Sequence, residues 1–282
     1  MTTYKLAIIG YPLTHSLSGV MQNAALKASG LEGEYETLET KPENLIQVIK
    51  KFKTEGYQGF NVTIPHKVPV TLFLNECDEL ANLTGSVNTV KILEDKSLSG
   101  YNTDVYGFIK SLPEGFSVNE ESAAVLGTGG ASRAIVAGLV HMGIKEIDLF
   151  SRNIIDSHET AQILRGRFPD VAINLLQNQM LANLEKYKII VNTTPIGMRN
   201  YAESISPLSD ETVETLREDA LISDIVYNPF KTELIKQAAR YGKKYAGGLD
   251  MLVFQGAKAF EIWTGIKPDA DKMKVAALEA LM

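Results

Sequence analysis

The sequence predicts an α/β protein of two domains, each containing a mostly parallel sheet. Two observations predict this fold class: short apolar runs alternate with helical stretches, and a second series of the same kind begins after a polar stretch at residues 113–122. Such alternation produces parallel strands covered by helices on both faces. The 282 residues fit about two domains of roughly 100–200 residues each.

The first series begins with the apolar run 5–10, which ends in Gly10 as a buried parallel strand would. A helix is expected over 18–29, with Gly30 as its stop. The remaining elements expected in this series are strands near Tyr35, at 59–63 and at 86–93, and helices at 44–55 and 68–75.

The second series begins with a strand at 123–127, a helix at 131–142 and a strand at 146–150. Further strands are expected near 171–175, 188–192 and 221–226, followed by C-terminal helices at 249–264 and 272–281. This order is typical of a Rossmann-type unit.

Composition excludes several classes of protein. The net charge is −6 and Lys and Arg form no block, so a nucleic-acid partner is not expected. No apolar run approaches the ~20 residues that span a bilayer, and the N-terminus lacks signal-peptide character, so we expect a cytoplasmic protein without a membrane partner. The single cysteine, Cys77, is expected to be a buried small hydrophobe, and neither it nor the four histidines suggests a metal site.

A glycine-rich turn follows the strand at 123–127. Gly127, Gly129 and Gly130 lead into the helix that begins near Ala131, whereas Ser132 takes the third position of the G-x-G-x-x-G pattern. Glycines at such a turn let the backbone approach a pyrophosphate, and the helix N-terminus offers free N–H groups. In this context the turn predicts a dinucleotide site, although an ordinary tight turn remains the alternative.

The end of the next strand indicates which dinucleotide binds. A carboxylate there would bind the ribose 2′-hydroxyl of NAD, whereas an arginine favours the 2′-phosphate of NADP. The strand ends in Ser151 and Arg152, and Asp148 lies inside it. NADP is therefore expected, with NAD as the weaker alternative.

Four polar segments interrupt the first series, and each has a structural explanation of its own. These polar segments are 10–18, 59–67, 85–89 and 100–104. Ser18 is expected to cap a helix, which does not explain Ser16. Pro65 suits the first turn of a helix and would place Lys67 near its N-terminus, where the dipole disfavours an ammonium and makes it a better proton donor and acceptor. Asp104 is expected at another helix start, where an N-cap role is the alternative.

Taken together, these segments resemble the shikimate dehydrogenase family. The stretches that carry the resemblance, in the family's order from Gly10 to Gly265, are GYPLTHSLS, GFNVTIPHK, GSVNT, GYNTD, LGTGGASRA, NTTPIGM and GGLDMLVFQGAKAFEIWTG. The resemblance implies an oxidoreductase that reversibly reduces 3-dehydroshikimate to shikimate with NADPH, in the shikimate pathway to chorismate and the aromatic amino acids. It also implies a substrate-binding catalytic domain (1–103 and 248–282), an NADP-binding Rossmann domain (104–247), and an active site in the cleft between them.

The resemblance also implies residue roles. Lys67 and Asp104 match the catalytic pair, without a metal. The implied substrate-binding residues are Ser16, Ser18, Thr63, Asn88, Tyr227 and Gln255. The implied cofactor-binding residues are Gly127, Gly129, Gly130, Ala131, Ser151, Arg152, Thr193, Gly248 and Met251.

The sequence departs from the family pattern at two places. Gly19 and Gln22 stand where proline and histidine are usual, and Asp156 replaces a second arginine four residues after Arg152. The second change weakens the preference for NADP. A quinate/shikimate dehydrogenase of relaxed specificity is the nearest alternative, and a non-catalytic dinucleotide sensor is a distant one. The sequence does not decide between a monomer and a homodimer.

Overall fold

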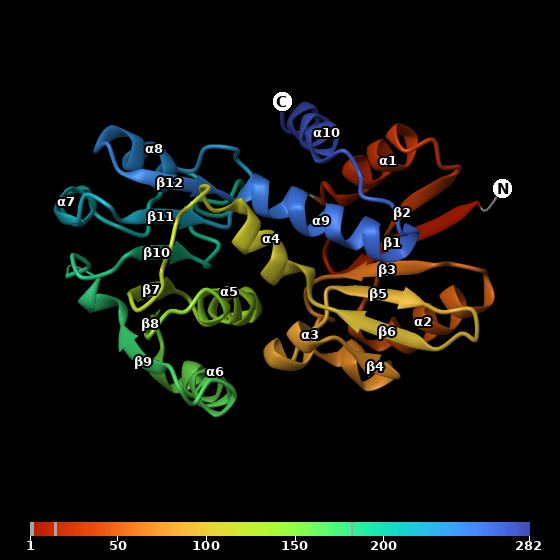
Figure 1. Ribbon diagram of the computed structural model, residues 1–282, viewed down its shortest axis with the longest axis horizontal. Helices are drawn as coiled ribbons and strands as arrows, with labels where there is room; N and C mark the ends of the chain where they lie inside the picture. Colours follow the sequence, from red (N-terminus) through yellow and green to blue (C-terminus); the bar gives the residue numbers. More distant parts are fainter. Residues whose placement is uncertain (1–2, 14–15, 182) are drawn as a thin grey trace. The chain divides into compact units, whose positions relative to one another are not determined.

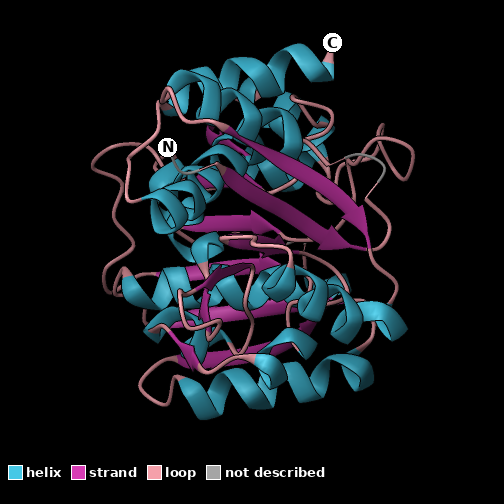
Figure 2. Cartoon of the chain, turned by 90° about the vertical axis from the view of Figure 1, so that its right-hand side faces the viewer, coloured by secondary structure: helices cyan, strands magenta, loops and turns pink. Residues whose placement is uncertain are grey.

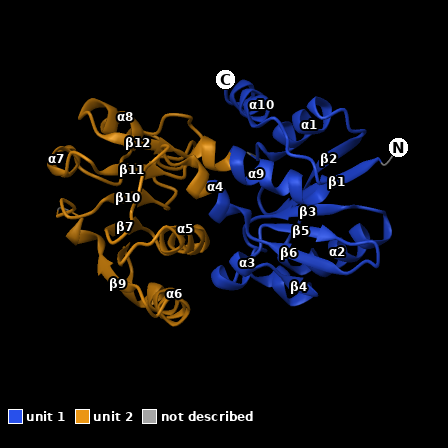
Figure 3. Ribbon diagram, viewed as in Figure 1, with its two compact units in different colours: residues 1–107, 253–282 blue, residues 108–252 orange. Residues whose placement is uncertain are grey.

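A computed structural model of the protein describes residues 3–13, 16–181 and 183–282. By its internal contacts the chain divides into two compact units, Met1–Gly107 with Val253–Met282, and Phe108–Leu252 (Figure 3). These units divide inside helices α4 (Thr103–Ser111) and α9 (Gly248–Thr264), whereas the expected domains divide at the starts of those helices. Each unit contains one six-stranded sheet (Figure 1).

The first unit has a mixed sheet in the order β2-β1-β3-β5-β6-β4. Its strands are β1 (Tyr4–Gly10), β2 (Gly33–Glu39), β3 (Gly59–Val62), β4 (Glu76–Cys77), β5 (Thr89–Ile92) and β6 (Leu98–Tyr101). β1 pairs in parallel with β2 and β3, and β4 with β6, whereas β5 runs antiparallel to both β3 and β6. The short connection between β5 and β6 forms a hairpin, which is why the sheet is less parallel than the alternation of elements predicted.

The helices of the first unit are α1 (Ser18–Ala28), α2 (Leu45–Thr54), α3 (Glu79–Thr84), the first part of α4, most of α9, α10 (Ala270–Leu281) and the 3₁₀ turns η1 (Pro42–Asn44) and η2 (Pro69–Phe73). The expected helix over 68–75 is only the short η2, and Pro69 rather than Pro65 lies at its start. The N–H of His66 donates to the carbonyl of Thr63, so Pro65 lies in a tight turn instead of a first helical turn. The prediction that Pro65 begins a helix next to Lys67 is therefore wrong.

Strand β1 is buried on both faces, which explains why its sequence is a continuous apolar run. Ala7 and Ile9 join a cluster with Phe52 of α2 and Phe60 of β3. On the other face, the cluster contains Leu6, Ile8, Leu13, Tyr35, Ala259 and Trp263. The C-terminal helices return to this unit, because α9 supplies Ala259 and Trp263, and α10 packs against α1.

The second unit has an all-parallel sheet in the order β12-β11-β10-β7-β8-β9. Its strands are β7 (Ser122–Leu126), β8 (Glu146–Ser151), β9 (Ala172–Gln177), β10 (Ile189–Asn192), β11 (Leu221–Asp224) and β12 (Lys244–Gly247). Read from β9 to β12, the strands have the Rossmann order 3-2-1-4-5-6. The helices are α5 (Gly130–His141), α6 (Ile154–Arg167), α7 (Asp210–Thr215), α8 (Glu233–Arg240) and the 3₁₀ turn η3 (Asn178–Met180), which alternate with the strands along the chain. Figure 2 shows the helices of the molecule in cyan and its strands in magenta.

Candidate active site

Lys67 and Asp104 form an ion pair in the first unit. The Nζ atom of Lys67 lies 2.6 Å from Oδ2 of Asp104, and the two side chains are 22% and 14% exposed. Their partial burial strengthens the pair relative to a surface pair while leaving both groups accessible. An ammonium held against a carboxylate can donate a proton and remain oriented by its partner.

Asp104 is free for this role because another residue caps its helix. Asp104 is the second residue of α4, and its own N–H donates to Oδ1 of Asn102 at 3.2 Å. Asn102 therefore caps this helix, which is the alternative role that the sequence offered for Asp104. The acidic side chain remains in the first turn of the helix, where the helix dipole favours a negative charge.

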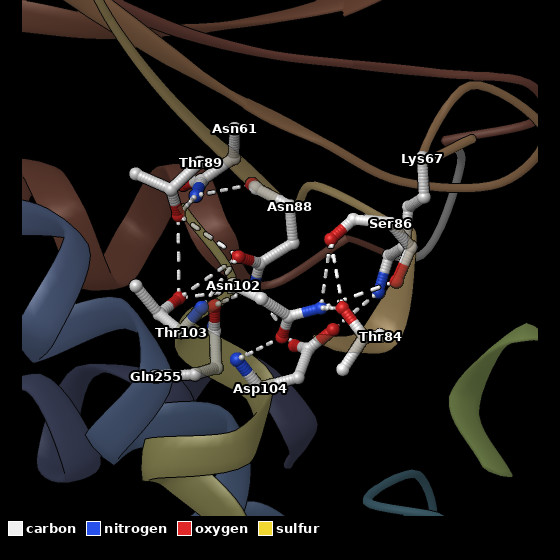
Figure 4. Close-up of polar contacts among 10 residues, drawn as sticks. All are labelled: Asn61, Lys67, Thr84, Ser86, Asn88, Thr89, Asn102, Thr103, Asp104 and Gln255. Atoms are coloured by element: carbon white, nitrogen blue, oxygen red, sulfur yellow. Dashed lines mark hydrogen bonds and ion pairs between the residues drawn. The ribbon is translucent and has the colours of Figure 1, made fainter. Parts of the chain in front are cut away.

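Asn88 provides the second donor to Asp104. Its Nδ2 donates to Oδ1 of Asp104 at 2.8 Å and to the hydroxyl of Thr103 at 2.9 Å, and it lies 3.4 Å from Oε1 of Gln255 (Figure 4). Asn88 is 3% and Gln255 8% exposed. The structure thus brings together four of the residues singled out from the sequence: Lys67, Asp104, Asn88 and Gln255.

Lys67 is held by the backbone of its turn. The carbonyl of Lys67 accepts the N–H of Val87 at 2.8 Å, and the carbonyl of Ile64 accepts the N–H of Tyr11. Thr63, directly after β3, lies so close to Gly10 that a Cβ at Gly10 would clash with its methyl group. The ends of β1 and β3 therefore meet, as expected where parallel strands carry functional loops.

The two serines near α1 differ from their predicted arrangement. Ser18 is the first residue of α1 rather than its N-cap, and its N–H donates to Oγ of Ser16 at 3.3 Å. The cap-like bond thus comes from Ser16, and the prediction that Ser18 caps the helix is wrong. Thr14 and His15, which belong to the same polar segment, lie outside the described residues.

Sequence reasoning missed several buried polar residues around this cluster. Asn61, in the middle of β3, accepts the phenol proton of Tyr35 at 2.7 Å and donates to the Thr89 hydroxyl at 3.0 Å. Burial raises the pKa of Tyr35 well above its usual value, and a hydrogen bond with Ser18 opposes this in part. A polar Asn inside an otherwise apolar strand was the available signal.

The glycine turn of the second unit fits a bound pyrophosphate. Gly127 has φ +101°, and a Cβ there would lie 2.9 Å from Oγ1 of Thr193. Gly129 is the N-cap of α5 and no side chain caps that helix, so its first N–H groups are directed outward. A Cβ at Gly129 or Gly130 would meet nothing within 4 Å, so the space beside these two residues is open.

Ser132 fits the position of the third glycine because its side chain turns back onto the turn. It is fully buried, and its hydroxyl donates to the carbonyl of Gly129 at 2.6 Å. Ala131, the second residue of α5, precedes it.

Other residues predicted to bind the cofactor or the substrate follow strands β10, β11 and β12 of the second sheet. Thr193 follows β10, and both its N–H and its hydroxyl donate to the carbonyl of Leu126 at the end of β7. Gly248 begins α9, where a Cβ would clash with the carbonyl of Ile225. Met251 lies one turn further, and Tyr227 follows β11, where burial raises its pKa.

Arg152 lies exposed at the end of β8, and no carboxylate of the described chain forms an ion pair with it. Ser151 is buried, and its hydroxyl contacts that of Ser157 at 2.6 Å. Asp156 accepts a hydrogen bond from Nδ2 of Asn153 at 2.6 Å, while Oδ1 of Asn153 caps α6. Asp156 therefore has a partner of its own in the first turn of α6.

Asp148 cannot serve as a ribose ligand in this arrangement. It is 2% exposed and bonds to Asn174, Tyr187 and Lys186 inside the unit. Across the described part of the chain, His, Cys, Asp and Glu form no group of three that could hold a metal ion. Among these same residues, no helix is long and apolar enough to cross a membrane.

Comparison with known proteins identifies the family. The chain is 40% identical over 276 residues to a "Shikimate dehydrogenase (NADP(+))" of Bacillus cereus strain AH187, and the match covers 97% of both chains. The chain belongs to the shikimate dehydrogenase family. Models of the shikimate dehydrogenase substrate binding domain and of the shikimate 5′-dehydrogenase C-terminal domain match residues 8–90 and 248–278.

Solved structures of this family agree with the fold. A shikimate dehydrogenase in complex with NADP+ has a TM-score of 0.90 at 37% identity, covering 99% of this chain and 96% of that one. A shikimate 5-dehydrogenase of Thermus thermophilus with NADP(H) and shikimate gives 0.86 at 34%, covering 99% and 100%. A quinate dehydrogenase of Corynebacterium glutamicum with NAD gives 0.89 at 27%, covering 98% and 99%.

Proposed function

We propose that this chain is an NADP-dependent shikimate dehydrogenase, which reversibly reduces 3-dehydroshikimate to shikimate in the pathway to chorismate and the aromatic amino acids. The observation that carries the proposal is the Lys67–Asp104 pair, 2.6 Å apart and held by Asn88, in a chain 40% identical to a relative of that name. A sensor that only binds a dinucleotide would have no use for a proton-transfer pair.

The two units divide the work in this proposal. The first unit, with the C-terminal helices, binds the substrate, and the second unit binds NADP. The proposed domain limits are 1–103 with 248–282, and 104–247. A cytoplasmic location and a monomeric or dimeric state stay predictions.

Lys67 acts as the proton donor during reduction. NADPH, when bound, supplies the hydride to the carbonyl carbon of the substrate. Negative charge then develops on the carbonyl oxygen, and the Lys67 ammonium stabilises this charge and delivers the proton. Asp104 orients Lys67 and accepts a hydrogen bond from the hydroxyl that forms.

Polar side chains of fixed position would hold the substrate. Ser16 and Ser18 bind the ring carboxylate through their hydroxyls in this proposal. The ring hydroxyls would be bound by Thr63, Asn88, Gln255 and Tyr227. Buried polar groups that expect a hydroxyl discriminate strongly against analogues that lack it.

The open glycine turn of the second unit suits the pyrophosphate of NADP. Gly127, Gly129, Gly130 and Ala131 would hold this group through backbone N–H groups and the start of α5. Arg152, exposed and without an ion-pair partner in the described chain, would bind the 2′-phosphate beside Ser151. Thr193, Gly248 and Met251 complete the proposed set of cofactor-binding residues.

The decisive experiment measures the absorbance of the reduced cofactor, NADPH or NADH, with shikimate or quinate as substrate and NADP+ or NAD+ as cofactor. We expect turnover of shikimate with NADP+ at a higher kcat/KM than shikimate with NAD+ or quinate with either. Equal or greater kcat/KM for quinate would favour the relaxed enzyme that the quinate dehydrogenase neighbour suggests. No turnover of any combination would reject the enzyme and favour the sensor.

A further inference from the structure

The hydroxyls of Thr89 and Thr103 contact the side chain of Asn88 in a cluster that is almost completely buried. Thr89 of β5 is 0% exposed, Thr103 at the start of α4 is 2%, and Asn88 itself is 3%. Figure 4 shows the polar contacts among these three residues. Polar groups at this depth cost free energy unless hydrogen bonds satisfy them. Their bonds therefore determine how the side chain of Asn88 is oriented.

The backbone of Thr103 fixes which end of the Asn88 amide faces which neighbour. The N–H of Thr103 lies 2.8 Å from Oδ1 of Asn88 and can only donate, so the oxygen must face it. The amide nitrogen then faces Oδ1 of Asp104 at 2.8 Å. With the amide reversed, an N–H would oppose an NH₂ and the Asp104 carboxylate would oppose a carbonyl oxygen.

The Thr103 hydroxyl completes this arrangement. It accepts the second amide proton of Asn88 at 2.9 Å and lies 3.2 Å from the Thr89 hydroxyl. Thr89 in turn accepts from Nδ2 of Asn61 at 3.0 Å and donates to Oδ1 of Asn88 at 3.2 Å. Each end of the Asn88 amide thus has a threonine partner, and Asn61 connects this set to β3.

We propose that Thr103 and Thr89 are positioning residues for the reaction, which fix the amide of Asn88 and through it the carboxylate of Asp104. This inference rests on the proposed function. The chain of contacts runs from the threonines to Asn88, from Asn88 to Asp104, and from Asp104 to Lys67 at 2.6 Å. A small rotation of the Asp104 carboxylate would move the Lys67 ammonium away from the reacting oxygen, and misplacement of a catalytic group lowers the rate.

The test removes only the hydroxyl. Thr103→Val keeps the shape and the backbone N–H, so we expect kcat for shikimate to fall about tenfold, or about 1.4 kcal/mol in activation free energy. KM for NADP+ should stay the same, because the second unit is unchanged. Thr103→Ser restores a hydroxyl and should return kcat to within about twofold of the wild type.

Two controls separate positioning from general packing. Thr212→Val removes a buried hydroxyl of α7 that contacts Ser209, so it should lower the melting temperature without lowering kcat. In an Asn88→Ala background, Thr103→Val should have no further effect on kcat, because its route to Asp104 is gone. Thr89→Val gives a second variant with the same expected coupling if Thr103→Val does not fold.

The outcomes are distinguishable from those of the proposed function. An inactive wild type would overturn the function and this inference together. If the wild type is active and a folded Thr103→Val or Thr89→Val variant keeps its kcat, this inference alone is overturned. It is also overturned if the kcat loss of the threonine variant adds fully to the kcat loss of Asn88→Ala. A kcat loss that Thr103→Ser reverses and that disappears in the Asn88→Ala background supports it.

Discussion

The two candidate binding regions differ in how their polar groups are satisfied. Around Asp104 the chain provides its own partners, since Lys67 and Asn88 both bond to Asp104, and Asn88 also donates to the buried hydroxyl of Thr103. Around the glycine turn of α5 the helix lacks a side-chain cap, and the positions beside Gly129 and Gly130 are open. The side chains of the first region are thus oriented by partners within the chain, whereas the second region has donors that a ligand would satisfy.

This difference indicates where precision and affinity arise. A proton donor needs a fixed orientation before the substrate arrives, which a satisfied network supplies. A site for an anionic cofactor needs unsatisfied N–H groups and cations, which bind phosphate when it comes. Loss of a member of the network around Asp104 should therefore lower kcat, and loss of a donor or cation of the second region should raise KM for the cofactor.

The largest effect is expected at Lys67. Lys67→Ala removes the proposed proton donor and should lower kcat by about 10²–10⁴-fold, the range for a positioned acid or base. KM for shikimate should change much less. Steady-state kinetics check this, and a variant with near-normal kcat would show that the pair has another role.

Cofactor variants should affect the second region alone. Asp156→Arg should tighten NADPH binding by about 1.5–3 kcal/mol if the new cation reaches the phosphate. This change also removes the acceptor for Nδ2 of Asn153, so the melting temperature should be followed as well. NADH binding should barely respond.

Arg152→Ala tests whether Arg152 selects NADP over NAD. It should lower the ratio of NADP to NAD utilisation, measured as kcat/KM for both cofactors, because the 2′-phosphate loses a charge-assisted bond. An unchanged ratio would mean that Arg152 does not select the cofactor.

A buried acid of the second unit should make stability depend on pH. Asp224 is 1% exposed; burial raises its pKa to about 6, although bonds from Thr232, Val226 and Asn192 oppose this. Its pKa is higher in the folded chain, so its contribution to stability is present below about pH 4 and disappears as pH rises through 6. Relative to Asp224→Asn, the wild type should thus lose at most about 3 kcal/mol between pH 4 and 7.

Denaturant unfolding across this pH range measures the difference. Asp148→Asn is the matched control, because hydrogen bonds from Tyr187, Asn174 and Lys186 outweigh burial and lower the pKa of Asp148. Its contribution is present at neutral pH and is lost as pH falls. Parallel stability curves for the wild type and Asp224→Asn would contradict the prediction.

The smallest effects are expected at the two serines of the first region. The hydroxyl of Ser16 accepts the N–H of Ser18 at 3.3 Å, so Ser16→Ala should cost about 0.5–1.5 kcal/mol of stability. Both Ser16→Ala and Ser18→Ala should raise KM for shikimate. If neither variant changes KM, the serines do not bind the substrate carboxylate.

The sequence predicted five of the six strands of the second unit, because the central strands are apolar runs separated by helices. It missed β12 at the edge of that sheet, and it missed β4 and β6 of the first unit, since strands of two to four residues leave little periodicity. The motifs contain Lys67, Asp104, Asn61 and Thr103, but a role was inferred only for the first two, because the roles of Asn61 and Thr103 arise from contacts with residues distant in the sequence. Which serine supports α1 depends on backbone angles that its polar segment does not determine.

The division of the first unit between the two ends of the chain affects folding during synthesis. One face of β1, including Leu6 and Ile8, is covered by Ala259 and Trp263, more than 250 residues later. The second unit, by contrast, is a continuous segment, Phe108–Leu252. We therefore expect a chain that ends at Leu252 to resist proteolysis in residues 108–252 and to be cleaved readily before them. In the growing chain, the segment translated first must then wait for the segment translated last, and its apolar strand needs protection from aggregation for nearly the whole of translation.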